Sequence, residues 1–468
     1  MKKAALWGSL CLILTNFLLS CKKDNVTPET TDIPSIHAAA LKAGTAKTDA
    51  YAGNDTWSLQ SQLDAGDVTL IAGKTYNVTD LTVTHSLNLN GATINFTNTG
   101  YGFALWVRGG NVSITNGTIQ GQWSSYMPGN PSGYGGIYVL ANNCSISHVN
   151  IANFSSYGIV AGAVNGSKVT YCNISNTGYI GYFYDAESAA THGGVFSNNV
   201  IDRSMVPAST VTQMALGIRG SANNSSVTTT NWTITNNILK MPVLPASWTG
   251  ACAEIRFCNN SYIANNVTTA GSMGLSMVAC TGDVLENNTT SATKLEGIEF
   301  ADCINCKTWN NKILSSYADG ILIDGGTGSN GIQLNGDVIS GTAQAGIHAY
   351  KKTINLTISG CKLSSTVVSP YAIELQQSSA VKILKTTMNG NGLGNTAVQL
   401  DNCPGGITMT GGSVSNFKSC AVNIYNSTAG LVTDNLSLSG VAITGVPRTL
   451  VQVLLNGGIL GTNISLPQ

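Results

Sequence analysis

A short recurring unit constrains the fold of this chain more than any other feature. It consists of Gly or Ala, an aliphatic residue, a variable residue and another apolar residue. The unit starts at Gly136, Gly158, Gly181, Gly217, Gly274, Gly297, Gly320, Gly346, Ala372, Ala397 and Ala421. Most steps are 21 to 26 residues long, and two longer steps after Gly181 carry insertions. Self-similarity at such a period predicts a stack of short structural repeats.

A second pattern follows each unit by about twelve residues. It is an apolar–polar alternation ending in Asn, as in TITNNIL from Thr233 and IANNV from Ile263. Alternation over such short runs predicts strands, and Asn tolerates the left-handed backbone of a tight turn. Each repeat is therefore expected to hold three short strands, with Asn between the second and third. The predicted asparagine column is Asn199, Asn237, Asn266, Asn288, Asn311 and Asn335.

These patterns resemble the pectate-lyase-like superfamily of right-handed parallel β-helices. The resemblance implies an all-β, single-stranded right-handed parallel β-helix of about a dozen coils over residues 54–468. The opening DTWSLQSQLDAG is similar to the superfamily's N-terminal cap helix, with Trp57, Leu59 and Leu63 covering the end of the barrel. Leucine-rich repeats need more Leu, and β-propellers need repeats of about 40 residues, so both fit less well.

The N-terminus resembles a bacterial lipoprotein signal. Lys2 and Lys3 precede an apolar run that ends in LLSC. The resemblance implies that residues 1–20 are removed and that Cys21 is lipidated, and residues 21–53 read as a flexible tether. We therefore expect a lipid-anchored protein of the cell envelope, at the outer membrane or cell surface, and a monomer. Loss of two lysines leaves 23 − 2 = 21 basic against 23 acidic residues, a balance that does not favour a nucleic-acid partner.

The cysteines follow the repeat. Those expected at one turn are Cys144, Cys258, Cys280, Cys303 and Cys403. Steps of 22 and 23 residues place Cys258, Cys280 and Cys303 one above another, which predicts buried, unpaired thiols. Cys303 and Cys306 form a lone C-x-x-C, which is weak evidence for a metal or redox site.

Charged residues gather in the outward positions of the first strands, although only 10% of the chain is charged. The predicted outward column is Tyr138, Val160, Phe183, Arg219, Arg256, Ser276, Glu299, Leu322, His348, Glu374, Gln399 and Asn423, with Glu254 on the same face and Asp185 and Asp324 two residues further along. A plain reading is an exposed polar strand face with cross-strand ion pairs. The alternative is a functional strip.

Insertions and aromatic residues support the functional reading. The segments 122–135, 202–216 and 240–252 all follow a third strand and precede a first strand, so they rise on one edge of the first sheet. Aromatic walls over a charged floor suit a sugar chain. The predicted substrate-binding residues are Asp185, Tyr184, Tyr182, Trp123, Trp248, Asp324 and Glu374.

Two chemistries fit the strip. A uronic-acid lyase needs a cation beside the carboxylate and a base, roles open to Arg219, Arg256 and His348, with a Ca²⁺ held by acidic neighbours as an option. A glycoside hydrolase needs two carboxylates, for which Glu254 with Glu299 or Glu299 with Asp324 are candidates. The predicted catalytic set is Glu299, Arg256, Arg219, Glu254 and His348.

The resemblance transfers no catalytic residue. Polygalacturonase-type hydrolases of the superfamily carry four motifs, and only Asp319, in YADGILID, matches one of them. The leading hypothesis is an exported enzyme acting on a polysaccharide, either lyase or hydrolase. The rival readings are a non-catalytic glycan-binding or adhesion protein and a structural spacer.

Overall fold

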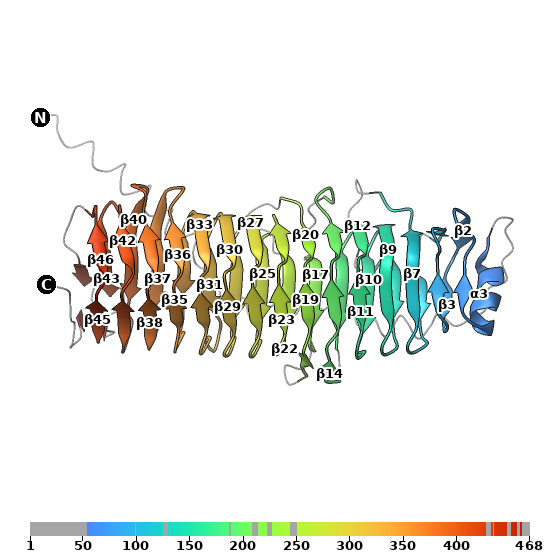
Figure 1. The fold of residues 1–468 in the computed structure, drawn as a ribbon, viewed down its shortest axis with the longest axis horizontal. Coiled ribbons are helices and arrows are strands. Elements are labelled where there is room, and N and C mark those ends of the chain that lie inside the picture. The colour runs from blue at the N-terminus through green and yellow to red at the C-terminus, as the bar shows by residue number, and fades with distance from the viewer. Residues whose placement is uncertain are drawn as a thin grey trace, which may run out of the picture. The chain divides into compact units, whose positions relative to one another are not determined.

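The computed structural model describes residues 54–98, 100–124, 130, 132–186, 189–207, 214–221, 227–243, 250–426, 432–433, 435–446, 451–455 and 459–460. The chain divides into two compact units, Met1–Ala46 and Lys47–Gln468, and all described residues lie in the second. This unit winds as a right-handed parallel β-helix, coil upon coil (Figure 1), so the predicted fold is confirmed. The predicted tether and signal, with Cys21, lie outside the described residues.

Sheet B holds the first strand of each coil, and all of its pairings are parallel. Its strands are β3 (Leu81–Val83), β6 (Gly102–Val107), β8 (Tyr134–Val139), β10 (Tyr157–Gly162), β13 (Ile180–Asp185), β17 (Met214–Arg219), β21 (Ala251–Arg256), β25 (Met273–Val278), β28 (Ile298–Ala301), β31 (Ile321–Asp324), β34 (Ala345–Ala349), β37 (Ser369–Gln376), β40 (Gly394–Asp401), β43 (Cys420–Asn426) and β47 (Val451–Leu455).

Sheet A holds the second and third strands of the coils, and β7 and β9 run through both rows. The second-strand row is β1 (Val68–Thr69), β4 (Leu87–Asn88), β7 (Ser113–Gln120), β9 (Ser145–Phe154), β11 (Lys168–Thr170), β15 (Val195–Ser197), β19 (Thr233–Thr235), β23 (Tyr262–Ala264), β26 (Val284–Glu286), β29 (Lys307–Trp309), β32 (Gln333–Asn335), β35 (Thr357–Ser359), β38 (Val381–Leu384), β41 (Ile407–Thr410) and β45 (Leu436–Ser439).

The third-strand row adds β2 (Thr75–Val78), β5 (Thr93–Phe96), β12 (Asn173–Thr177), β16 (Val200–Asp202), β20 (Ile238–Lys240), β24 (Val267–Thr269), β27 (Thr289–Thr293), β30 (Lys312–Ser316), β33 (Val338–Thr342), β36 (Lys362–Ser364), β39 (Thr387–Asn389), β42 (Ser413–Ser415) and β46 (Ala442–Thr444). Small additional sheets join β14 (Thr191–His192), β18 (Thr229–Thr230) and β22 (Cys258–Asn259), and β44 (Val432–Thr433) with β48 (Ile459–Leu460).

The core is a set of apolar columns inside the coils. In sheet B, Leu275 pairs with Ile298 and Ile298 with Ile321, and all three side chains are buried. Alternate residues of each strand face outward, because successive side chains point to opposite faces of a sheet. Sheet B therefore seals the core with one face, and many side chains of its other face are buried as well, among them Tyr138, Phe183 and Leu322.

A buried amide ladder ties the turns between second and third strands. Asn237 donates through Nδ2 to Oδ1 of Asn266 (2.8 Å), Asn266 to Asn288 (2.9 Å) and Asn288 to Asn311 (2.9 Å). Each backbone N–H of the donor residue bonds the same oxygen. The predicted column is thus confirmed from Asn199 to Asn311. Its predicted last member is wrong: Asn335 lies in β32, and Asp337 accepts from Asn311 instead.

The left-handed turn residue is the neighbour before each ladder member. Asn198, Asn236, Asn265, Asn287 and Asn310 have φ between 50° and 58°. Asn serves there because its short polar side chain tolerates this conformation, and Gly336, at φ 65°, takes the place beside Asp337. Of the two consecutive asparagines, the first therefore adopts the left-handed turn conformation, and the second hydrogen-bonds to the next coil along the axis.

A helix, α3 (Thr56–Ala65), closes the N-terminal end as predicted. Leu59 and Leu63 are buried against the first coils, but Trp57 is 70% exposed and does not cover the core. Gln60 exchanges hydrogen bonds with the backbone of Thr82 in β3, which satisfies part of an open sheet edge. None of the described residues forms a helix long and apolar enough to cross a membrane.

The thiols fill the core. All ten described cysteines are buried and lie outside any disulfide, including Cys258, Cys280 and Cys303. Burial raises the pKa of the Cys258 and Cys303 thiols well above the usual range. The prediction of stacked core thiols is confirmed.

Candidate functional site

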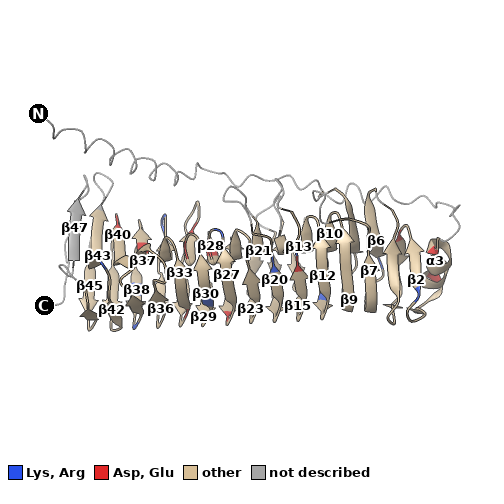
Figure 2. Cartoon of the chain, turned by 90° about the horizontal axis from the view of Figure 1, so that it is seen from above, with Lys and Arg blue, Asp and Glu red and all other residues tan. Residues whose placement is uncertain are grey.

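The candidate site is the outer face of sheet B, which carries Glu254, Arg256, Glu299, His348 and Glu374. Figure 2 marks the charged positions along the coils, and several of them lie on sheet A as well. Strand pairing gives its first outward column as Tyr138, Val160, Phe183, Gly217, Glu254, Ser276, Glu299, Leu322, His348, Glu374, Gln399 and Asn423. The second column holds Asp185, Arg219, Arg256, Val278, Ala301 and Asp324.

The predicted register was wrong for two arginines. Arg219 and Arg256 lie in the second column, level with Asp185, and Gly217 and Glu254 take their expected places. The error is a shift of two residues, because the apolar pattern of these coils fits both alignments. A shift of two keeps each side chain on the same face of the sheet. The two arginines therefore still belong to the outer face, as predicted.

The basic end of the strip is a compact ion cluster. Arg219 Nη2 lies 3.4 Å from Glu254 Oε1, and Arg256 Nη1 lies 3.9 Å from the same oxygen. The Arg219 guanidinium also stacks over the Phe183 ring, 5.3 Å from its centroid. Asp185 lies beside Arg219 in the preceding coil, so the cluster combines two guanidinium groups with two carboxyl groups, and the guanidinium N–H groups could also donate to an anionic group of a ligand.

The middle of the strip is less open than predicted. Glu299 is only 7% exposed and accepts a hydrogen bond from Ser276 Oγ at 2.7 Å. Leu322, its neighbour in the next coil, is also buried. Asp324 lies one coil beyond and two residues along, so its Cα is about 8 Å from that of Glu299.

The acidic end is built around His348. Its Nδ1 lies 3.0 Å from Oδ2 of the buried Asp319, and Asp319 Oδ1 accepts from the backbone of Ala345. Nε2 lies 3.9 Å from Glu374 Oε2, and no protein hydrogen bond reaches it within the described residues. Asp319 thus orients the imidazole, and Nε2 is a buried nitrogen with no hydrogen-bond partner in the described part of the chain.

These acids set the protonation of the site. Burial by itself would lower the pKa of His348, but the hydrogen bond to Asp319 and the charges of Asp319, Glu374 and Asp324 outweigh it, so that pKa is raised. Burial also raises the pKa of Glu374, against the opposing effect of His348 and a hydrogen bond from Gln376. A raised pKa favours the protonated form of each group, and acid catalysis requires a protonated group.

Three predicted sugar-binding aromatics are core residues. Tyr182 and Tyr184 occupy inward positions of β13, are fully buried, and pack on Phe196 and Trp232. The Tyr184 hydroxyl donates to the carbonyl of Val164. Trp123 is also buried, in the hydrophobic core. Trp248 lies outside the described residues.

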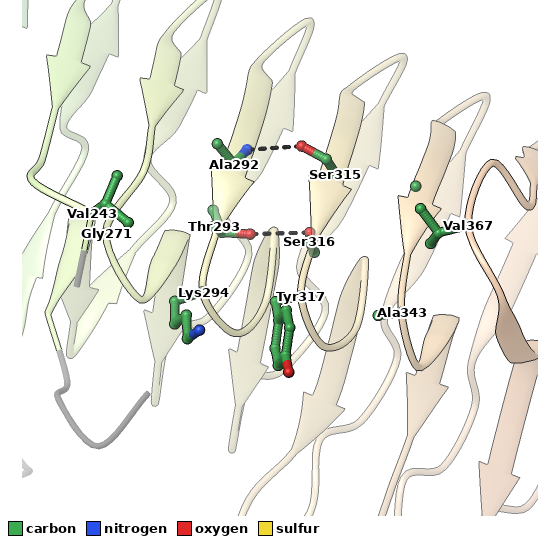
Figure 3. Close-up of a pocket in the computed structure, with 11 residues that line it drawn as sticks. Val243, Gly271, Ala292, Thr293, Lys294, Ser315, Ser316, Tyr317, Ala343 and Val367 are labelled. Atoms are coloured by element: carbon green, nitrogen blue, oxygen red, sulfur yellow. Dashed lines mark hydrogen bonds between the residues drawn. The ribbon is translucent and has the colours of Figure 1, made fainter. Parts of the chain in front are cut away.

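The predicted edge for the insertions is confirmed by the order of strands. Each of the segments 122–135, 202–216 and 240–252 joins a third strand to a first strand. A pocket of about 450 Å³ opens along this edge between Val243 and Val367 (Figure 3). The pocket lies beside the predicted strip, since its lining residue Tyr317 precedes Asp319 by two residues in the chain. Its lining is mainly apolar.

Sequence reasoning missed the partnership of Asp319 and His348. Asp319 was noticed as an isolated motif match, but 29 residues separate it from His348. The repeat period could have predicted this contact, because a step of one coil places residue 345 beside residue 319, and His348 follows residue 345 closely. The arrangement of Asp319 and His348 offers groups for acid–base chemistry. Among the described residues, no cluster of three or more His, Cys, Asp or Glu is arranged to hold a metal ion such as Ca²⁺.

Fold and site together define a right-handed parallel β-helix protein with an ionisable strip on the outer face of one sheet. Residues 221–363 match the family model described as right handed beta helix region. No curated protein matches the chain.

Solved structures with a similar course include a mannuronan C-5 epimerase, a tailspike protein and a polysaccharide lyase. The A-module of the mannuronan C-5 epimerase AlgE6 of Azotobacter vinelandii is 13% identical, with a TM-score of 0.41 over 90% of this chain and 98% of that one. The Dettilon tailspike protein is 13% identical, with a TM-score of 0.48 over 68% and 65%. A mannuronic acid specific family 6 lyase from human gut microbiota is 12% identical, with a TM-score of 0.41 over 74% and 85%. Likeness this distant transfers no activity to this chain.

Proposed function

We propose that the protein is a polysaccharide-cleaving enzyme of the glycoside hydrolase type, with its catalytic groups at the acidic end of the sheet B strip. The observation that carries the proposal is the row Asp319–His348–Glu374, in which an oriented imidazole lies between two carboxyl groups on the outer face. Acid–base cleavage of a glycosidic bond needs such groups at fixed positions.

The proposed proton donor is Glu374. Its raised pKa favours the protonated form, which can donate to the oxygen of the breaking glycosidic bond. Asp401 lies one coil further and two residues along, which puts the two Cα atoms about 8 Å apart. A water held between them would lose its proton to Asp401 while its oxygen attacks the sugar carbon, so that one water is consumed for each bond broken.

The arginines serve recognition in this proposal. Glu254 and His348 are four coils apart, or about 19 Å along the axis. Arg219 and Arg256 therefore contact a different sugar from the one that is cleaved. A chain bearing carboxylates at intervals would lie along the strip, with an anionic sugar at the basic end.

Elimination is the second candidate, favoured by the Nε2 of His348, a buried nitrogen without a hydrogen-bond partner among the described residues. A lyase would use it to take a proton next to the carboxylate, while the C–O bond breaks and a double bond forms. Elimination ranks second because Asp319 and Asp324 add negative charge beside His348, and this charge would repel a uronate at that position.

The test is product formation by the full chain on acidic and neutral polysaccharides, including polygalacturonate, alginate and a β-glucan. New reducing ends without ultraviolet absorbance support hydrolysis, whereas an ultraviolet-absorbing unsaturated sugar means elimination. Glu374→Gln should abolish turnover, and Glu286→Gln, on sheet A, should not. Retention of a polysaccharide without any product would mean a glycan-binding protein, the remaining alternative.

Lipidation of Cys21 and attachment to the cell envelope belong to the same proposal. A surface-anchored enzyme would meet polymers too large to be imported. This part rests on the LLSC segment alone.

A further inference from the structure

A row of side chains lines the edge where third strands pass into first strands. Backbone hydrogen bonds place Lys294, Tyr317 and Ala343 level with one another in successive coils. Val367, in the following coil, also lines the pocket. The row therefore alternates in size: the bulky ring of Tyr317 is followed by the single methyl of Ala343 and then by Val367.

This alternation leaves a slot. Two coil spacings, about 10 Å, separate the levels of Tyr317 and Val367, and only Ala343 lies between them. Figure 3 shows Tyr317 projecting from its coil beside Lys294, with the small Ala343 on its other side. Tyr317 is 65% exposed and Val367 is 42% exposed, so the two walls are accessible.

Lys294 covers one face of the Tyr317 ring. Its Nζ lies 4.3 Å from the ring centroid, in a cation–π contact. The face toward Ala343 is the wall of the slot. A flat, weakly polar ligand face fits between such walls, and the ammonium beside it favours a ligand that also carries a negative charge.

We propose that this slot is a sugar-binding subsite that takes one pyranose ring of an acidic polysaccharide. The ring would stack on Tyr317 above Ala343, and a carboxylate of the adjoining sugar, beyond the edge of the Tyr317 ring, would pair with Lys294. The inference rests on the proposed function, because it assigns the slot to the same polysaccharide that the sheet B strip binds.

Continuity with the strip identifies this occupant. Tyr317 lies two residues before Asp319, which orients His348, and Ala343 lies two residues before Ala345, which bonds Asp319. A polymer bound across the slot would therefore pass directly to the acidic end. The subsite would position the sugar next to the one that is cleaved.

The experiment measures retardation of the full chain during native electrophoresis in gels that contain polygalacturonate, alginate or a neutral β-glucan. Tyr317→Ala should weaken binding of the acidic polymers about 3- to 10-fold, the worth of one aromatic contact, and Tyr317→Phe should retain it. Lys294→Met should weaken binding of the acidic polymers only, and less so at high salt. Tyr101→Ala and Lys312→Met are controls, since both residues are exposed elsewhere.

The outcomes separate the subsite from the catalytic proposal. Turnover by the wild type with no effect of Tyr317→Ala on retardation would overturn the subsite and leave the enzyme standing. Absence of turnover, with retardation lost in Tyr317→Ala and kept in Glu374→Gln, would support the subsite and overturn the enzyme. No retardation by any polymer would overturn the subsite. A dimer in gel filtration that Tyr317→Ala dissociates would likewise overturn it, in favour of a protein interface.

Discussion

Replacing Asp337 by Asn should stabilise the protein at neutral pH and leave it unchanged in acid. Asp337 ends the amide ladder, where its Oδ1 accepts from the backbone and side chain of Asn311 and its other oxygen accepts from Thr308. Burial raises the pKa of this carboxyl from 3.8 to about 6, despite these hydrogen bonds. An asparagine would accept the same two bonds from Asn311 without a charge to bury.

The sign follows from the direction of the shift. A carboxyl with a folded pKa above its unfolded pKa binds its proton more tightly in the folded state, so its contribution is complete below about pH 4 and is lost as pH rises through 6. The shift of about two units corresponds to about 3 kcal/mol. Dividing this free-energy difference by the unfolding entropy typical of about 400 residues gives a rise in Tm of about 3–4 °C.

Thermal unfolding of wild type and Asp337→Asn, followed by circular dichroism from pH 4 to pH 8, measures the effect. The difference in Tm should be near zero at pH 4 and should grow to its full value by pH 7. Asp64→Asn, an exposed position on α3, is the control and should show no such growth. A difference that does not depend on pH, or a less stable variant at pH 8, would refute the reasoning.

Four further results are expected. Asp319→Asn should lower the pKa of His348, because the carboxylate that raises it is gone, and the limb of the pH–rate profile that depends on His348 should shift to lower pH. An unchanged limb would contradict this assignment. Asn288→Ala should lower stability by about 3–5 kcal/mol through loss of its side-chain ladder bonds, seen as a lower melting temperature than that of the exposed control Asn150→Ala. The ten described cysteines should react with iodoacetamide only after unfolding, and rapid native labelling would disprove their burial. Cys21→Ala should release the protein from the membrane fraction, and unchanged fractionation would refute lipidation.

The outer-face register shows where a sequence pattern becomes ambiguous. Residues Leu216 and Ile218 are both apolar, so a repeat unit can be started at either of two positions, two residues apart. Only the pairing of Gly217 with Phe183 and of Glu254 with Ser276 fixes the alignment. Insertions before these strands removed the regular spacing that set the register in other coils.

The aromatic residues of β13 show a second limit. Alternation along GYFY predicts that Phe183 lies on one face of the sheet and its two tyrosine neighbours on the other face. The residue type does not decide their role, because tyrosine occurs both in protein cores and at sugar-binding sites. The structure places Tyr182 and Tyr184 inside, because their coil has room for large rings against Phe196 and Trp232. The nature of the partner residues, rather than the strand pattern, decided their role.

By itself the sequence determined the repeat, the parallel coils, the cap helix, the amide ladder up to Asn311 and the burial of the thiols. All of these depend on residues that recur at one period, so each coil repeats the same local information. The tertiary structure decided which charged groups meet. Asp319 contacts His348, and Tyr317 faces an open slot above Ala343. Both depend on differences in length and side-chain size between neighbouring coils at single positions. These differences take effect only when one coil stacks on the next, so the repeat pattern of the sequence does not reveal them.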